Sequence, residues 1–395
     1  MIYDAQRRVS QNKFHPLYLT NIPWIKVNKK AFKEFIRDFC GRSCPDESTL
    51  RKSYLKPLYR KSIDTIRSEI GNNWIYLQVD EAVVARRILV SVVVGVLNGE
   101  RPKSYCLNLV QLKSAINNTS LQQAITDSLT ILWPDRIRYE NVRLLVTDQA
   151  SYMIAASSQM KMSLHPDMLH ITCVCHALHR VCEEIRIKHP AADSLVNNFK
   201  ITFAKSTRRV AGLEQAVECS LPSFPVNTRW GTWLSFCVFL AENFEDIKGY
   251  VSGLAGEDCC AIEPLIENLN SSQRRSELLS IYEIRSLIST IKSLEERGLI
   301  IREQKELIDS ARTRLPSAFA RKLDSCLAKN PDFERLFKLE DLNHSIRYLQ
   351  SPLASVDVER CFSQLKCILT DRRQSFNETN FLHYAIVYYN SFVDQ

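Results

Sequence analysis

Apolar positions recur with helical spacing in the N-terminal part of the chain and then change to short, β-rich runs. Residues 28–70 fit a helical pattern with a break at 41–45, and Asp46, which opens the segment DESTL, is placed to begin a helix. Three short runs of strand-forming residues come after a turn at 71–73. They predict a meander of three strands at residues 74–80, 87–97 and 104–112.

Downstream of the meander the pattern alternates between helix and strand. Strands are expected at residues 142–148 and 168–174, and helices at 121–132, 151–162 and 176–205. Three adjacent strands followed by alternating helices and strands predict an α/β fold, a mixed sheet with helices on both faces. This order of elements is that of the ribonuclease H-like architecture.

The second half of the chain lacks a clear strand pattern. Residues 235–350 read as an all-helical block, in which the apolar positions from Ile281 to Leu294 predict one long amphipathic helix. Apolar helices rich in Phe and Tyr return at 353–392. The sequence therefore predicts a basic helical region at 1–72, a first part of the core at 73–234, a helical insertion at 235–350, and the end of the core with a C-terminal segment at 351–395.

Composition narrows the class of protein. The chain has 395 residues, of which 45% are hydrophobic and 24% charged, as is usual for a globular protein and unlike a disordered or collagen-like chain. Its longest apolar run, residues 88–97, is about half of what a membrane helix requires, so no membrane partner is expected. Without a recognisable signal sequence, the 13 cysteines are expected to be free thiols in a reducing compartment.

The net charge of +8 is concentrated near the N-terminus. Residues 1–70 contain 15 Lys and Arg against 7 Asp and Glu, which equals the excess of the whole chain. The densest group consists of Arg51, Lys52, Lys56, Arg60 and Lys61. A basic arm on a neutral body is typical of proteins that bind nucleic-acid phosphates, so these five residues are expected to bind DNA. The alternative is an ordinary solvated helix face.

Two aspartates stand where predicted strands end. Asp80 closes the first strand and Asp148 the fourth, and these strands are neighbours in a ribonuclease H-like sheet, so both carboxylates would meet at one edge. Such acids can hold two hard cations, Mg²⁺ or Mn²⁺, about 3.5–4 Å apart, and Glu359 is the candidate third ligand. Taken singly, Asp148 could cap the next helix, Asp80 could be a turn residue and Glu359 could form a surface ion pair. Glu81 is a poor ligand candidate because side chains alternate along a strand.

Residues 171–184 (ITCVCHALHRVCEE) hold a dense run of cysteines and histidines: Cys173, Cys175, His176, His179 and Cys182. Structural zinc sites usually draw on two separated pairs of ligands, and no second pair at suitable spacing is present. Zinc is therefore not expected. The thiols read as small core residues, and one or both histidines as facing a polar site.

Seven segments in order resemble a hobo/Activator-type (hAT) transposase over residues 20–392. They are NIPWIKVNKKAFKEFIRDF (21–39), CPDESTLRK (44–52), VDEA (79–82), VTDQASYM (146–153), HITCVCHALHRVCEEIR (170–186), NTRWGTWL (227–234) and SVDVERCFSQLK (355–366). The sequence is most similar to the subgroup whose members resemble a CGG-triplet-repeat-binding protein. The resemblance implies a ribonuclease H-like core interrupted by a helical insertion, a C-terminal dimerisation segment and a nuclear protein that acts on DNA as a homodimer or larger oligomer.

The resemblance also implies roles for single residues. The family's catalytic triad falls on Asp80, Asp148 and Glu359, the same three acids. Its C-x-x-H motif falls on Cys173 and His176, and the histidine is expected to help position DNA, with Cys173 structural.

The family's aromatic signature falls on Arg229 and Trp230, where the tryptophan would lie near a flipped or flanking base. For Trp230 and Trp233 plain core packing is the alternative, and Trp233 is taken as structural.

Two departures from the family bear on function. Family members begin with a BED zinc finger, and no C-x-x-C…H pattern precedes the matched segments. After Asp80 the chain reads AVVARR (82–87), where the family has further Thr and Asp. The expected function is metal-dependent DNA cleavage and strand transfer, and the alternative is a catalytically inactive, transposase-derived nuclear protein that binds DNA and dimerises. A ribonuclease H or 3′–5′ exonuclease fits less well, because Asp80 and Glu81 lack the Asp-x-Glu spacing.

Overall fold

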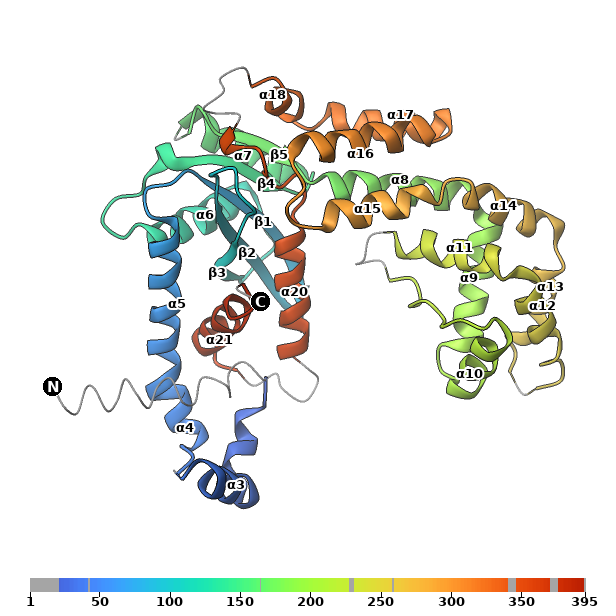
Figure 1. The fold of residues 1–395 in the computed structure, drawn as a ribbon, viewed down its shortest axis with the longest axis horizontal. Helices are drawn as coiled ribbons and strands as arrows, with labels where there is room; N and C mark the ends of the chain where they lie inside the picture. Colours follow the sequence, from blue (N-terminus) through green and yellow to red (C-terminus); the bar gives the residue numbers. More distant parts are fainter. Residues whose placement is uncertain are drawn as a thin grey trace. The chain divides into compact units, whose positions relative to one another are not determined.

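Figure 1 shows the computed structural model of the chain, which describes residues 21–41, 43–163, 165–226, 231–257, 259–339, 346–369 and 376–393. Its internal contacts divide the chain into two compact units. The sheet unit comprises Met1–Thr172 and Asp332–Gln395, and the helical unit comprises Cys173–Pro331. The sequence places the limits of a helical insertion at 235 and 350, whereas both limits of the helical unit come earlier along the chain.

The sheet unit is built on one mixed sheet of five strands, in the order β3-β2-β1-β4-β5. β1 pairs antiparallel with β2 and β2 with β3, while β1 and β4, and β4 and β5, run parallel. The predicted mixed α/β class is confirmed. The strands are β1 (Ile75–Val84), β2 (Arg87–Val96), β3 (Ser104–Leu112), β4 (Val142–Thr147) and β5 (Leu169–Thr172).

The first strand is longer than the sequence predicts, and Asp80 does not end it. β1 continues to Val84, which pairs with Arg87 of β2. The two residues of the turn, Ala85 and Arg86, both have positive φ angles, of 48° and 64°. Tight hairpins of this kind normally carry Asn-Gly or Asp-Gly. Because neither glycine nor asparagine marks this turn, the pattern alone stopped the strand too early.

Helices cover both faces of the sheet. On the face of Leu77 and Val79, Asn108 of β3 donates a hydrogen bond to Ser128 of α6 at 3.1 Å. On the opposite face, Gln78 is hydrogen-bonded to Asp357 of α20. The helices around the sheet are α5 (Leu55–Ile70), α6 (Asn118–Leu132), α7 (Ser151–Ser163), α18 (Phe333–Phe337), α20 (Val356–Ile368) and α21 (Glu378–Asn390).

The outer edge of the sheet is closed by α21. Asn390 accepts a hydrogen bond from the backbone N–H of Cys106 at 2.8 Å and donates one to its carbonyl at 2.9 Å. One side chain thus occupies both backbone groups of a residue on the edge strand β3, which blocks pairing with another strand there. Ile386 and Tyr389 of the same helix are buried in the core, while Phe392 is 37% exposed. Dimerisation through this segment stays a prediction.

The Tyr76 side chain extends from β1 across β2 to β3, and its path requires a glycine in β2. Its ring lies over Gly95 of β2, and its hydroxyl is 2.7 Å from the hydroxyl of Ser104 on β3. A Cβ atom at Gly95 would lie 2.3 Å from the ring. Tyr76 is fully buried, so its ring has no free space to move into.

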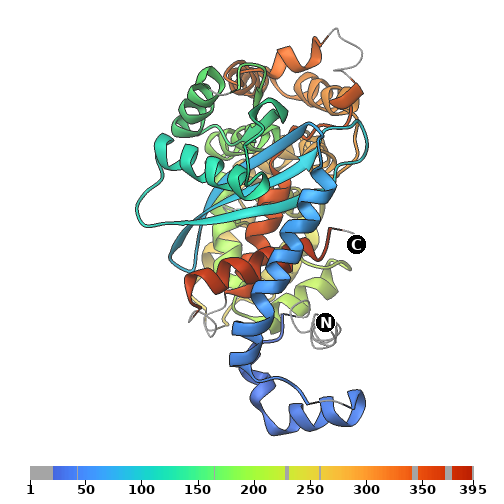
Figure 2. The same cartoon turned by 90° about the vertical axis from the view of Figure 1, so that its left-hand side faces the viewer.

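The N-terminal helices extend away from the sheet along α5 (Figure 2). They are η1 (Trp24–Asn28), α3 (Lys30–Cys40), α4 (Glu47–Thr49) and η2 (Leu50–Tyr54). The predicted break and restart are confirmed. Gly41, with φ of 63°, ends α3, and the Asp46 carboxylate accepts the backbone N–H of Thr49 at 2.7 Å to begin the next helical stretch.

In the helical unit, the described residues form helices and no strand. Two helical predictions are wrong in the same way. The helix expected at 176–205 is divided at Pro190, which cannot donate a backbone hydrogen bond, and the long helix expected at 281–294 is divided by a turn at 283–285. The helices are α8 (Val174–Lys188), α9 (Pro190–Phe203), α10 (Thr207–Ala216), α11 (Thr232–Glu242), α12 (Phe244–Ser252), α13 (Ile262–Leu269), α14 (Ser272–Tyr282), α15 (Ser286–Glu295), α16 (Ile301–Arg314) and α17 (Ser317–Ala328).

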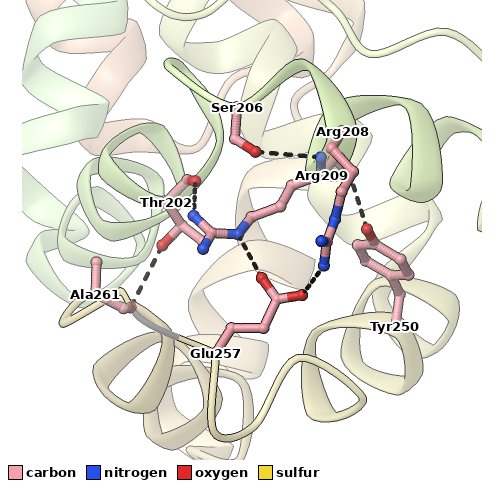
Figure 3. A network of polar contacts seen from close by, with 7 residues as sticks. All are labelled: Thr202, Ser206, Arg208, Arg209, Tyr250, Glu257 and Ala261. Carbon is pink, nitrogen blue, oxygen red and sulfur yellow. Dashed lines mark hydrogen bonds and ion pairs between the residues drawn. The ribbon is translucent and has the colours of Figure 1, made fainter.

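A polar network centred on Glu257 joins several of these helices (Figure 3). Glu257 forms ion pairs with Arg208 and Arg209, the latter at 3.0 Å. Arg209 also donates to the carbonyl of Thr202 at 3.2 Å and accepts, through its own carbonyl, from the Tyr250 hydroxyl at 3.1 Å. The network therefore fixes α10 to α9 and α12. None of the helices that the structure describes is long and apolar enough to cross a membrane.

Replacing Gly95 with alanine is expected to destabilise the protein by about 1–3 kcal/mol, because the new methyl group overlaps the buried Tyr76 ring. Urea unfolding monitored by circular dichroism measures the loss. Gly249→Ala is the matched control: a Cβ there meets nothing within 4 Å, and alanine favours the helix α12, so the change should be neutral or stabilising. Equal stabilities of the two variants would contradict the proposed packing.

Candidate active site

Asp80 on β1 and Asp148 directly after β4 occupy equivalent positions relative to the register of these two neighbouring parallel strands. The last pair in the register of β1 and β4 is Gln78 with Val146, and two residues further along are Asp80 and Asp148. Alternation along β1 places Asp80 on the face of Gln78, which α20 covers, while Asp148 directly follows the end of β4. Asp80 is only 5% exposed, and one of its carboxylate oxygens accepts the backbone N–H of Glu81 at 2.8 Å.

Asp148 has two roles open to it. It follows directly after β4 and is half-buried. Its Oδ1 accepts the backbone N–H of Ala150 at 3.0 Å, which prepares the turn into α7. This bond forms an Asx turn ahead of α7; it uses one carboxylate oxygen, and the second can still bind a ligand.

α20 reaches the sheet through the buried carboxylate of Asp357, a residue that the sequence did not single out. Its Oδ2 accepts from Ser104 at 2.5 Å and from Gln78 at 3.3 Å, and its Oδ1 accepts from Arg360 at 2.7 Å. Its backbone N–H donates to Gln78 at 3.2 Å, and its carbonyl accepts from Tyr389 at 3.2 Å. A carboxylate that is 4% exposed is tolerated because its oxygens are engaged by these donors.

This docking brings Glu359 to Asp80. Glu359 lies two residues after Asp357 on α20 and is half-buried. A carboxylate oxygen of Glu359 and one of Asp80 lie within 4.8 Å of each other. Two carboxylates at this separation repel each other in a partly buried site, and a cation that both of them bind offsets the repulsion. The structure thus gathers two of the three predicted acids and places the third on the adjacent strand.

Tyr152 of α7 is a polar neighbour of this site that the sequence analysis missed. Its hydroxyl donates to the carboxylate of Glu81 at 2.7 Å. Burial raises the pKa of Tyr152, and the hydrogen bond to Glu81 and the charges of Asp148 and Asp80 raise it further. Glu81 is thereby engaged with α7, in agreement with the expectation that it is a poor partner for Asp80.

A chain of buried hydrogen bonds leads from Asp332 to the backbone of Asp148. Asp332 accepts from Lys161 at 2.6 Å and from the backbone N–H of His170 at 2.8 Å. The His170 ring nitrogen Nε2 lies 2.9 Å from the Thr147 hydroxyl, which donates to the Asp148 carbonyl at 2.7 Å. Because the Thr147 proton is used there, Nε2 is assigned as the donor of a neutral imidazole. Burial lowers the pKa of His170 to about 4.

The cysteine–histidine run belongs to the helical unit. Cys173 precedes the first residue of α8 and is buried, and His176 lies in the first turn of that helix. A hydrogen bond with Cys173 and burial raise the pKa of Cys175, while burial raises the pKa of Cys182 to about 12 and lowers the pKa of His179. Buried, protonated thiols of this kind are core residues. Among the described residues, no three ligand atoms of this run come together as a metal site.

The five predicted DNA-binding cations are exposed along η2 and α5. Arg51 forms an ion pair with Glu47. Within the described part of the chain, none of the other four has an ion-pair partner: Lys52, Lys56, Arg60 and Lys61. A spacing of four residues puts Lys52, Lys56 and Arg60 on one side of the helix.

Arg229 and Trp230 lie outside the described residues, so their predicted contact with DNA has no structural counterpart here. Trp233 lies on α11 and is only 6% exposed, as in the core-packing alternative.

Comparisons with known proteins add no family to these observations. No protein-family model matches the chain. No curated protein matches it either. The function is therefore argued from the site.

Lowering the pH is expected to destabilise the protein through His170. Its pKa is about 4 in the folded protein and about 6.5 in the unfolded chain, so the unfolded chain takes up the proton first as the pH falls. Well above pH 6.5 the ring is neutral in both states and does not lower the free energy of unfolding. That free energy falls by about 3 kcal/mol as the pH is lowered to 4. Urea titrations of the wild type and His170→Gln at pH 7 and pH 4 measure it. The variant should lose less than the wild type, and an equal loss would contradict the assignment.

Proposed function

We propose that this protein is a hAT-type transposase that cleaves DNA and transfers strands at an acidic site formed by Asp80, Asp148 and Glu359. The observation that carries the proposal is the approach of the Asp80 and Glu359 carboxylates to within 4.8 Å, because these acids are 279 residues apart in the sequence. Carboxylates brought together from distant parts of the chain are what a site for hard divalent cations requires.

The sheet supports the finer proposal of a ribonuclease H-like core interrupted by a helical insertion. Three antiparallel strands followed by two parallel ones, in the order β3-β2-β1-β4-β5, form the arrangement that the sequence led us to expect. The helical unit then intervenes between β5 and α20 in the sequence. We propose that α20 is the last helix of such a core, since it carries the third acid.

The donor set suits a hard divalent cation. Asp80, Glu359 and the second oxygen of Asp148 offer carboxylate oxygens, the ligands that Mg²⁺ and Mn²⁺ prefer. When bound, such ions activate the attacking water or 3′-hydroxyl and stabilise the leaving oxygen of a phosphodiester. The chain's own contribution is orientation. Asp357 fixes the register of α20 and thus the place of Glu359, and the bond from Ala150 sets the rotamer of Asp148.

The remaining roles follow from the family resemblance. His176, Arg229 and Trp230 are proposed on this ground to contact DNA. The charge pattern adds Arg51, Lys52 and the exposed cations of α5. The protein is proposed to be nuclear and to assemble with itself through its C-terminal segment.

A catalytically inactive, transposase-derived DNA-binding protein is the second candidate, and one observation favours it. The residues that continue β1 after Glu81 and form its turn, residues 82–86, include no further carboxylate beside the site.

Nicking of a labelled DNA duplex in the presence of Mn²⁺ tests the proposal. The wild type should cleave, and Asp148→Ala should reduce the rate by at least about a hundredfold because it removes a metal ligand. Asp135→Ala is the matched control: this aspartate is exposed in the same unit and should cleave at the wild-type rate. Cleavage by neither the wild type nor Asp148→Ala, with DNA binding retained, would favour the inactive protein instead.

The exposed cations of α5 should set the salt dependence of DNA binding. In Lys56→Gln/Arg60→Gln, the slope of log affinity against log salt should become shallower by about 1.8, because each phosphate that a cation neutralises contributes about 0.9 to the slope. Arg101→Gln/Lys113→Gln removes two exposed charges elsewhere in the sheet unit and should leave the slope unchanged. The same slope in both double variants would show that α5 does not bind phosphates.

A further inference from the structure

The helical unit contains a hollow of about 810 Å³ that plays no part in the acidic site. Its walls come from α11, α15, α16 and the turn between α14 and α15, the turn that divides the predicted long helix. α15 packs against α16, and α11 against α14 (Figure 1). Three cations line it: Arg285, Lys292 and Arg314. Glu283 is the single acid in its lining.

The three cations that line the hollow are not neutralised by ion pairs with any described residue. Some arginines of the unit are held by acids, as in the pairs Arg209–Glu257, Arg312–Asp324 and Arg275–Glu245, whereas these three share one hollow without such partners among the described residues. In the part of the chain that the structure describes, Arg285, Lys292 and Arg314 have no ion-pair partner. Like charges around one hollow repel each other, and an anion bound between them offsets that repulsion.

One of the three cations is held in place before any ligand binds. The Arg285 guanidinium stacks on the Tyr282 ring, 4.0 Å from its centre, and donates to the Tyr282 carbonyl at 2.9 Å. A guanidinium fixed in this way keeps further N–H groups for an oxyanion. Ser235 and Ser289 add small, uncharged polar side chains to the lining of the hollow.

We propose that this hollow binds phosphate groups of a DNA backbone. The net positive lining suits an anion, and the hollow is open to solvent, as a site for an extended phosphate backbone has to be. The choice of DNA rests on the proposed function, and other phosphate compounds share the chemistry. The helical unit would thus hold DNA through a surface separate from the basic residues of α5.

Binding of a fluorescent duplex is measured over a range of NaCl concentrations in EDTA, so that no metal-dependent step enters. In the full chain carrying Arg285→Gln/Lys292→Gln/Arg314→Gln, the affinity at 0.1 M salt should fall by about tenfold or more, and the salt slope should become shallower by about 2.7. The matched control is Arg302→Gln/Arg321→Gln/Lys329→Gln, which removes three exposed cations of the same unit outside the hollow. It should bind like the wild type.

A parallel calorimetric titration with inorganic pyrophosphate identifies the source of the phosphate. Loss of duplex affinity confined to the hollow variant supports the proposal, whereas an equal loss in the control variant, or none in either, overturns it. Pyrophosphate binding that the hollow variant abolishes, with unchanged duplex affinity, overturns DNA as the ligand. Because no cleavage is measured, an inactive acidic site cannot produce any of these results.

Discussion

The buried carboxylate of Asp357 joins parts of the sheet unit that lie far apart in the sequence. It joins a C-terminal helix to two strands formed more than 250 residues earlier, through Gln78 and Ser104. An unpaired carboxylate in that position would be strongly destabilising, so the helix is stable in the register in which these donors meet it. The polar contact selects one register, and the place of Glu359 follows from it.

The same buried polar layer imposes a constraint on the strands beneath. Tyr76 must cross β2 to reach Ser104, which in turn bonds Asp357, and it can do so because Gly95 has no side chain. Strand geometry, helix register and the acidic site are therefore coupled. Replacing Gly95 should therefore disturb α20, the helix that carries Glu359, although Gly95 lies on β2, a strand without a predicted ligand.

The distribution of charge gives the two units different chemical characters. The sheet unit concentrates acids in a partly buried site, whereas its exposed helix α5 and the hollow of the helical unit present cations without ion-pair partners among the described residues. A polyanion that is bound through its phosphates and cut at a metal site requires both features. Sequence composition indicated the basic helix, because its cations are adjacent in the chain. The sequence did not indicate the hollow, since its three cations come from α15, α16 and the turn between α14 and α15.

Local patterns determined much of this protein. Short strand-like runs bounded by turn residues predicted β3 to the residue, and the Asp46 segment predicted a helix start, because both depend on neighbours in the chain. The extension of β1 past Asp80 was missed, since a turn of Ala85 and Arg86 carries no turn residue, and the break near Arg285 was missed, since apolar spacing continues across it. Only the tertiary structure decided which acids meet and why. Glu359 reaches Asp80 because Asp357 docks α20, and that contact joins residues whose separation in sequence leaves no pattern to detect.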